Sequence, residues 1–303
     1  MESREKIIIS GATGMIGRAI VCRKIQDGDE VTCIVHRNTK RLSNLPDSER
    51  LKVLECNLDE YGSLSLDESY DVFIHLAWDA TSGAGRDDAD LQMRNIQYTL
   101  DAVHLAHRLG CRKFIGAGSQ AEYGIQSSPL TGDLAVNPQS GYGIAKFASG
   151  KLAMMLCRSL GMESNWVRIL SVYGPGQGKQ TLIAYLIDCI QSGQTPDLTP
   201  CEQTWDYLYS EDAAEAILRI ADSGVNGKVY PLGSGCGRHL ADYIRDLRDA
   251  VNPNVELGFG RKEYYPHQPM YLLADISELT RDTGWKPVTS FSEGIRKTLE
   301  KSR

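Results

Sequence analysis

The sequence predicts an α/β fold in which a doubly wound parallel sheet is joined by a smaller C-terminal lobe. Short apolar segments rich in β-branched residues alternate with helical patterns through the first half of the 303-residue chain. A glycine-rich turn connects the first apolar segment to the first helical pattern. After Gly174 the strand–helix alternation gives way to loop-like sequence mixed with short helical patterns, which indicates the second, smaller unit.

Five apolar segments in the first half are expected to form buried strands: "KIIIS", "EVTCIVH", "LKVLEC", "DVFIHLA" and "KFIGAG". Helices are expected between several of them, in "MIGRAIVCRKIQDG" and "LQMRNIQYTLDAVHLAHRLG". A third helix, "YGIAKFASGKLAMMLCRSLG", precedes the strand "NWVRILS". Near-continuous apolar strands that alternate with helices indicate a parallel sheet covered on both faces.

The predicted boundary between the two units lies at residue 174. Residues 1–174 form the larger domain, and the stretch 206–234 is expected to return to it. Residues 175–205 and 235–303 then form the smaller lobe, so the two units are interleaved along the chain.

Composition argues against several classes of partner. The net charge is −6 with no long run of either sign, which disfavours nucleic acid and anionic membranes as partners. No apolar stretch approaches membrane-spanning length, and the N-terminal hydrophobic region is too short for a signal peptide. The eight cysteines are scattered without a C-x-x-C or a Cys/His cluster. We therefore expect buried free thiols in a reducing cytoplasm, with no metal site and no disulfide framework.

The segment "SGATGMIG" follows the first predicted strand and opens the first predicted helix. Gly11, Gly14 and Gly17 form a G-x-x-G-x-x-G pattern. Glycines at these points permit a tight turn and a close approach of the backbone to a pyrophosphate, which the N–H groups of the helix N-terminus then bind. In this strand–turn–helix context the pattern predicts a Rossmann-type dinucleotide site.

The end of the second predicted strand indicates which dinucleotide is bound. An acidic residue there would bond the ribose 2′-hydroxyl of NAD, but this chain has His36, Arg37 and Asn38. A guanidinium pairs with a 2′-phosphate, so Arg37 predicts NADP, with NAD as the alternative. Arg18 is placed to assist. Asn57 and Leu58, after the third strand, stand where an adenine contact is expected, although an ordinary turn explains them equally well.

Tyr142 and Lys146 form a Y-x-x-x-K pattern in "SGYGIAK". Residues four apart share one face of a helix. A nearby ammonium and an oxidised nicotinamide both favour the phenolate, so we expect the pKa of Tyr142 to be lowered from about 10. Ser119, at the end of the fifth predicted strand, is expected to join this pair.

At this point the chain resembles the extended short-chain dehydrogenase/reductase family, in its NAD(P)-dependent epimerase/dehydratase group acting on nucleotide sugars. The resemblance extends over essentially the whole chain. It rests on "GATGMIG", "DVFIHLAW", "GSQAEYG", "YGIAK", "VYGPGQG", "WDYLYSEDAAEA", "YPLGSG" and "GWKPVTSFSEGI". The tail "FGRKEYYPHQPMYLLADISELTRDTGWKP" is similar to 4-ketoreductases of the CDP-abequose synthase type.

The resemblance implies a Rossmann domain, a nucleotide-sugar-binding C-terminal lobe, and a catalytic triad that maps onto Ser119, Tyr142 and Lys146. It also implies a homodimer formed through a four-helix bundle, with the helices around 91–109 and 143–160. The residues expected to bind the cofactor are Gly11, Thr13, Gly14, Met15, Ile16, Gly17, His36, Arg37, Asn57, Leu58, Leu76, Ala77, Tyr142 and Lys146.

Departures from the family pattern carry information about the reaction. Family members that dehydrate the sugar commonly carry aspartate and glutamate after the serine or threonine, whereas this chain has Gln120 and Ala121. An amide and a methyl group cannot act as acid and base, so the dehydration apparatus is absent. Glu122 is offset by one residue, and on an extended segment it would face away from the site and serve a structural role.

The second lobe is expected to hold the sugar nucleotide. Ser171 stands where many sugar epimerases carry asparagine, and Trp205 replaces an arginine of the family pattern, which puts a phosphate role there in doubt. Arg261 is the candidate for the diphosphate, with a surface arginine as the alternative. The candidate substrate-binding residues are Asp79, Thr81, Ser119, Tyr173, Gln177, Arg261 and His267. His75 is expected to be a packed strand residue.

These features favour NADPH-dependent reduction of a nucleotide-linked 4-keto-6-deoxyhexose at C4, with Tyr142 supplying the proton. The alternative is an NAD-dependent C4 epimerase of a nucleotide sugar. A reductase of non-sugar ketones and a non-catalytic NADP-sensing protein are weaker alternatives. Sensing proteins of this fold typically lack the tyrosine or the lysine, and both are present here.

Overall fold

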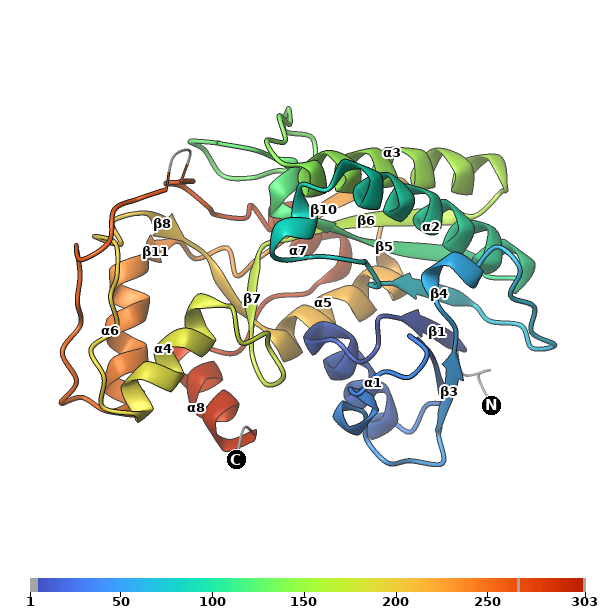
Figure 1. The fold of residues 1–303 in the computed structure, drawn as a ribbon. Helices are drawn as coiled ribbons and strands as arrows, with labels where there is room; N and C mark the ends of the chain where they lie inside the picture. The colour runs from blue at the N-terminus through green and yellow to red at the C-terminus, as the bar shows by residue number, and fades with distance from the viewer. Residues whose placement is uncertain (1–4, 266–267, 302–303) are drawn as a thin grey trace.

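The computed structural model describes residues 5–265 and 268–301, and its centre is a parallel sheet (Figure 1). The sheet has seven strands in the order β10-β6-β5-β4-β1-β2-β3. The strands are β1 (Ile7–Ser10), β2 (Val31–Val35), β3 (Leu51–Glu55), β4 (Val72–His75), β5 (Lys113–Ser119), β6 (Glu163–Ile169) and β10 (Val229–Leu232). The order reverses between β1 and β4, so the predicted doubly wound α/β fold is confirmed.

Helices cover both faces of this sheet. On one face lie α2 (Ala89–Arg108) and α3 (Gly141–Ser159), which pack on alternate strand residues such as Ile8, Phe73 and Phe114. On the other lie α1 (Met15–Gln26), α5 (Ser210–Ser223) and α7 (Ser277–Thr283). The two sets of alternate strand residues are both apolar, which explains why the strands read as continuous hydrophobic runs.

A second layer of structure lies beyond the carboxyl ends of the strands (Figure 1). It contains α4 (Leu182–Gln191), α6 (Leu240–Val251) and α8 (Phe291–Lys301), which share an apolar core that includes Leu186, Leu247 and Ile295. Two small sheets join it to the body. One pairs β7 (Ser171–Tyr173) with β9 (Tyr207–Tyr209), and the other pairs β8 (Thr204–Trp205) with β11 (Arg238–His239).

Single-turn 3-10 helices connect several of the longer elements. They are η1 (Leu42–Asn44), η2 (Leu58–Glu60), η3 (Ala84–Arg86) and η4 (Gln120–Glu122). They follow strands β2, β3, β4 and β5 in turn, at the edge of the sheet where ligands bind in folds of this class.

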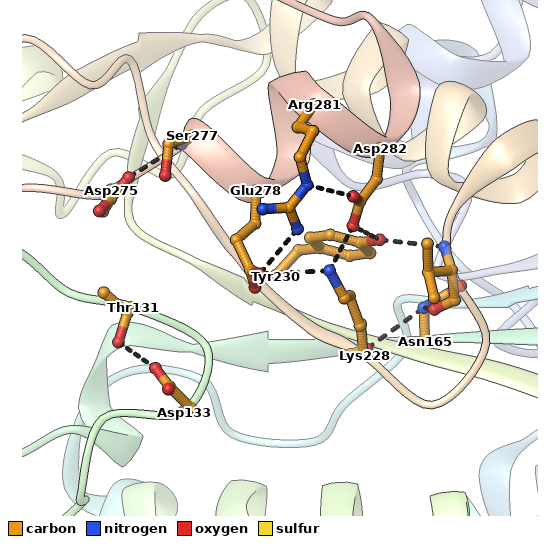
Figure 2. Close-up of polar contacts among 11 residues, drawn as sticks. Thr131, Asp133, Asn165, Lys228, Tyr230, Asp275, Ser277, Glu278, Arg281 and Asp282 are labelled. Atoms are coloured by element: carbon orange, nitrogen blue, oxygen red, sulfur yellow. Dashed lines mark hydrogen bonds and ion pairs between the residues drawn. The ribbon is translucent and has the colours of Figure 1, made fainter.

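Helix α7 falls within the range 235–303 that we predicted to belong to the smaller lobe, yet it packs against the large sheet. Figure 2 shows the polar contacts that hold it there. Asp282 accepts hydrogen bonds from Lys228 Nζ at 2.7 Å and from Tyr230 Oη at 2.8 Å, at the start of β10. The rest of the predicted division at residue 174 stays a prediction.

All eight cysteines are free thiols, but only five are buried. Cys236 is exposed, so the expectation of uniformly buried thiols was wrong at this position. Within residues 5–265 and 268–301, no helix has the length and apolar character needed to cross a membrane. The same residues contain no group of three or more histidine, cysteine or acidic side chains placed to hold a metal ion.

Candidate active site

The glycine-rich turn after β1 leaves no room for side chains. Gly11 has φ of +75°, and a Cβ there would lie 2.7 Å from the backbone nitrogen of Ala77. A Cβ on Gly17 would lie 2.5 Å from the carbonyl oxygen of Gly11. Helix α1 therefore begins directly against the turn, and its first turn carries no acidic residue. Such a helix N-terminus is suited to binding the phosphates of a dinucleotide.

Two neighbouring cavities extend from this turn. One, of about 590 Å³, runs toward the ends of β2 and β3, and the other, of about 350 Å³, runs toward α3. The predicted cofactor residues that line them are Gly11, Thr13, Gly14, Met15, Ile16, Gly17, His36, Asn57, Leu58, Leu76, Ala77, Tyr142 and Lys146. The structure thus brings all but one of the predicted cofactor residues to one continuous edge of the sheet.

The exception is Arg37, which is held by a carboxylate. Its Nε and Nη2 donate to Glu60, the closest contact being 2.9 Å from Nε to Oε2. Glu60 also accepts from the backbone N–H of Asn57 at 2.7 Å. These bonds lower the pKa of Glu60, and the bond from Arg37 has the largest effect. The carboxylate therefore stays charged beside the arginine. The sequence analysis missed this acid, although it lies three residues after Asn57 in "CNLDE".

Arg18, which we expected to assist Arg37, donates from Nε to the carbonyl of Asn44 at 2.8 Å. It lines a separate cavity of about 280 Å³ between α1 and α5. Met15 lines the same cavity but Arg37 does not, so the structure does not show Arg18 assisting Arg37.

The predicted triad comes together where β5 meets α3. Ser119 ends β5, while Tyr142 lies in the first turn of α3, which Ser140 caps by accepting from the N–H of Gly143 at 3.1 Å. Lys146 is one turn further on and donates from Nζ to the carbonyl of Ala117 at 2.7 Å. All three triad side chains line the 350 Å³ cavity that begins at Gly11.

Burial controls the ionisation of the triad. It raises the pKa of Tyr142, against the opposing effects of the Ser119 hydrogen bond and the charge of Arg86. In the protein alone, the loss of solvation outweighs the nearby positive charges. The lowering that we expected depends also on the oxidised nicotinamide, and it stays a prediction. Burial also lowers the pKa of Lys146 to about 7, although Glu122 partly opposes it.

Two further residues frame the tyrosine, and the sequence analysis named neither of them as a site residue. The indole of Trp78 lies edge-on to Tyr142, with ring centroids 5.9 Å apart, and Lys146 Nζ lies 3.7 Å from the indole centroid. The guanidinium carbon of Arg86 lies 4.3 Å from the centroid of the Tyr142 ring. Trp78 is adjacent to the predicted cofactor residue Ala77, which was the one available signal.

Two more cavities meet beside Ser119, on the side away from the glycine turn. A cavity of about 270 Å³ is lined by Ser119, Gln120 and Ala121, and one of about 560 Å³ extends into the C-terminal layer. Gln120 and Trp205 line both. Trp205 Nε1 donates to Ser171 Oγ at 2.9 Å, so the two residues that depart from the family pattern in this lobe bond to each other.

The predicted substrate residues are distributed unevenly over these cavities. Gln177 and Tyr173 line the 560 Å³ cavity, but Tyr173 is 1% exposed and its hydroxyl already donates to the carbonyl of Phe291 at 3.0 Å. Asp79 and Thr81 line the 590 Å³ cavity with the cofactor residues. Arg261 is exposed and pairs with Asp197 at 3.2 Å. His267 lies outside the described residues.

His75 lies in β4 as a packed strand residue. Its Nδ1 shares a hydrogen bond of 2.7 Å with Ser10 Oγ, and burial lowers its pKa to about 3. The ring is therefore neutral at physiological pH.

Comparison with known proteins agrees with this geometry. The model of the NAD dependent epimerase/dehydratase family matches residues 7–233. The dTDP-4-dehydro-6-deoxyglucose reductase of Escherichia coli is 23% identical over 328 residues, covering 100% of this chain and 99% of the relative. The CDP-abequose synthase of Salmonella typhimurium is 25% identical over 314 residues, covering 98% of each.

The solved structure of UDP-N-acetylglucosamine 4-epimerase from Methanobrevibacter ruminantium, in complex with UDP-N-acetylmuramic acid, has the same fold. Its TM-score is 0.87 at 24% identity, with 99% of this chain and 98% of that chain covered. Relatives of comparable similarity thus include both a reductase and an epimerase by name.

Proposed function

The chain belongs to the NAD-dependent epimerase/dehydratase family, and from this membership we propose that it reduces a nucleotide-linked 4-keto-6-deoxyhexose at C4 with NADPH. The observation that carries the proposal is the lining of the 270 Å³ cavity beside Ser119. Gln120 and Ala121, the two residues that follow Ser119, both line this cavity and offer neither an acid nor a base. Ketone reduction needs neither group, whereas dehydration needs both.

The residues take the following roles in the proposal. The glycine turn and the N-terminus of α1 hold the cofactor phosphates, and the bound nicotinamide supplies the hydride. Ser119 donates a hydrogen bond to the ketone oxygen, and Tyr142 transfers its hydroxyl proton to that oxygen as it becomes an alkoxide. Lys146, buried beneath them, orients the cofactor ribose and favours the phenolate when protonated.

We further propose that the 560 Å³ cavity takes the nucleotide. Gln177 and Lys262 line it, and Asp197, the partner of Arg261, does so as well. Arg261 would have to release Asp197 before it could bind a diphosphate. Lys262 would not have to break that ion pair. The bonded pair of Trp205 and Ser171 closes the side where the family pattern has an arginine.

The proposed reaction is tested by supplying the substrate directly. The purified protein is expected to oxidise one NADPH per molecule of nucleotide-linked 4-keto-6-deoxyhexose. The loss of NADPH absorbance measures this oxidation. Formation of a 4-keto-6-deoxy product from a parent nucleotide hexose, without added reductant, would refute the proposal.

A second candidate, the NAD-dependent C4 epimerase, is favoured by one observation. Glu60 lies beside Arg37, near the place where an acid would bond the ribose 2′-hydroxyl of NAD. NAD retained through purification, together with interconversion of two C4-epimeric nucleotide sugars without net cofactor use, would decide for the epimerase.

The Arg37–Glu60 pair gives a prediction about cofactor choice. Arg37→Ala should weaken binding of NADPH about tenfold and of NADH little, because only NADPH carries the 2′-phosphate. Glu60→Gln should instead strengthen binding of NADPH, because it frees the guanidinium of Arg37 and removes a negative charge that repels the 2′-phosphate. Dissociation constants from nicotinamide fluorescence measure both. Equal changes for the two cofactors in both variants would show that Arg37 is only a surface charge.

We also propose a homodimer formed through α2 and α3. Met93 on α2 and Ile144, Leu152 and Met155 on α3 are large apolar side chains on the exposed sides of these helices. A second copy packed on this face would bury all four in a four-helix bundle. Sedimentation at micromolar concentration should give twice the mass of the chain, and a monomer would contradict the proposal.

A further inference from the structure

The guanidinium of Arg86 lies over the ring face of Tyr142, with 4.3 Å between its central carbon and the ring centroid. Arg86 ends η3 and is half-buried at the rim of the 270 Å³ cavity that Ser119 also lines. Its Nη1 donates to the carbonyl of Thr81 at 2.7 Å. No carboxylate within residues 5–265 and 268–301 forms an ion pair with it, so its charge is not neutralised by the protein around it.

The position of Arg86 is fixed to the helix that carries Tyr142. The backbone N–H of Gly141 donates to Asp87 Oδ1 at 2.9 Å, and a Cβ on Gly141 would lie 3.0 Å from the carbonyl oxygen of Arg86. From the other side, Gln92 Nε2 donates to the carbonyl of Gly85 at 2.8 Å. The η3 turn is therefore bonded to the N-terminus of α3, and the guanidinium stays over the ring.

The other charged groups around Tyr142 either lie farther from its ring than Arg86 or are neutralised by an ion pair. Lys146 Nζ is 5.9 Å from the ring centroid, and burial lowers its pKa to about 7, so its charge is partly lost at neutral pH. Glu122, on η4, is neutralised by Arg168 at 2.8 Å. A guanidinium stays protonated throughout the working pH range. Arg86 is thus the permanent positive charge at this ring.

We propose that Arg86 is a positioning residue that stabilises the Tyr142 phenolate formed during the reaction. In the reduction, the O–H bond of Tyr142 breaks and a new O–H bond forms on the substrate oxygen, while the nicotinamide donates a hydride to the carbonyl carbon. The negative charge then resides on the tyrosine until solvent returns a proton. A cation over the ring attracts the phenolate more strongly than the neutral phenol. This inference rests on the proposed role of Tyr142.

The test compares Arg86→Met, which removes the charge, with Arg86→Lys, which keeps it. Arg50→Met is the matched control, because Arg50 likewise donates from Nη1 to a loop carbonyl, that of Gly28, at 2.9 Å and lies away from the site. Ionisation of Tyr142 is read as tyrosinate absorbance with saturating NADP, by subtracting the titration of the same protein carrying Tyr142→Phe. The subtraction is needed because the chain has 14 tyrosines.

Arg86→Met should raise the titration of Tyr142 by about one pH unit and lower kcat about tenfold. In Arg86→Met, the pH above which kcat for reduction falls should move upward, because the phenol of Tyr142 must stay protonated to act as the acid. Arg86→Lys should largely restore both values, and Arg50→Met should change neither. The same Tyr142 titration and the same pH profile of kcat in Arg86→Met and the unchanged protein would overturn the inference.

The absorbance titration requires no sugar substrate, so it separates the two proposals. A shifted titration in a protein that reduces no 4-keto sugar would retain the Arg86 inference and reject the proposed substrate. An unshifted titration in a protein that reduces the 4-keto sugar would retain the proposed substrate and reject the Arg86 inference. Equal losses of kcat in Arg86→Met and Arg86→Lys, with an unchanged titration, would show a purely structural role and would also reject the inference.

Discussion

Tyr142→Phe is expected to lower kcat for ketone reduction by roughly 10²–10⁴-fold, because it removes the proton donor and leaves the ring in place. Tyr142 is 8% exposed and packs edge-on against Trp78, and phenylalanine fills the same space. Affinity for the dinucleotide should hardly change, since the glycine turn after β1 carries most of that binding. The measurements are NADPH turnover and nicotinamide fluorescence on the same preparation.

Tyr70→Phe is the matched control. Its hydroxyl lies 3.1 Å from Thr32 Oγ1 and 3.0 Å from Glu68 Oε2, near the amino-terminal ends of β2 and β4 and outside the cavities around Tyr142, so the substitution loses a hydrogen bond without affecting the site. Near-normal turnover in Tyr142→Phe would show that another group is the acid. A parallel loss of cofactor affinity would show instead that the substitution had disturbed the pocket.

The fold and the cofactor edge were predictable because their signals are local. The strands are contiguous apolar runs, and Gly11, Gly14 and Gly17 stand together in one turn. Tyr142 and Lys146 lie four residues apart on one helix, so their shared face follows from helix geometry alone. Ser119 required only that β5 end where its apolar run ends, which it does.

The rest depends on contacts between segments that are far apart in sequence. Arg37 meets Glu60, and Arg86 meets Tyr142, across separations of 23 and 56 residues, which no pattern in one sequence reports. Tyr173 was predicted to contact sugar because it lies in a family motif, but its hydroxyl bonds to the carbonyl of Phe291, 118 residues away. Motifs indicate which residues are present at a site, and the packing decides which atoms of those residues are available.

The stretch "GSQAEYG" combines both cases. We expected Glu122 to face away from the site on an extended segment, but η4 is a turn of 3-10 helix and the segment is not extended. That turn directs the carboxylate into the core, where the side chain is fully buried. Its Oε1 accepts from the backbone N–H of Ser119 at 2.8 Å and from Trp166 Nε1 at 2.9 Å, and Oε2 accepts from Arg168 Nε at 2.8 Å.

This ion pair lies directly behind the proposed catalytic serine. Arg168, on β6, is 3% exposed, and its guanidinium carbon lies 4.6 Å from the centroid of the Tyr123 ring. Because both charges are out of water, each depends on the other for compensation. The pair therefore connects the stability of the sheet to the placement of Ser119, whose backbone N–H it binds.

Glu122→Gln should lower the free energy of unfolding by about 3–5 kcal/mol, because it leaves the guanidinium of Arg168 buried without its counter-charge. Glu300→Gln is the control: it breaks an exposed pair with Arg296 on α8, in which both side chains are more than half exposed, and should leave stability essentially unchanged. Denaturant unfolding measures all variants. Adding Arg168→Met to Glu122→Gln should recover part of the loss, since the uncompensated charge is then gone. If Glu122→Gln is no less stable than Glu300→Gln, the pair does not hold this part of the core, and Ser119 must owe its position to other contacts.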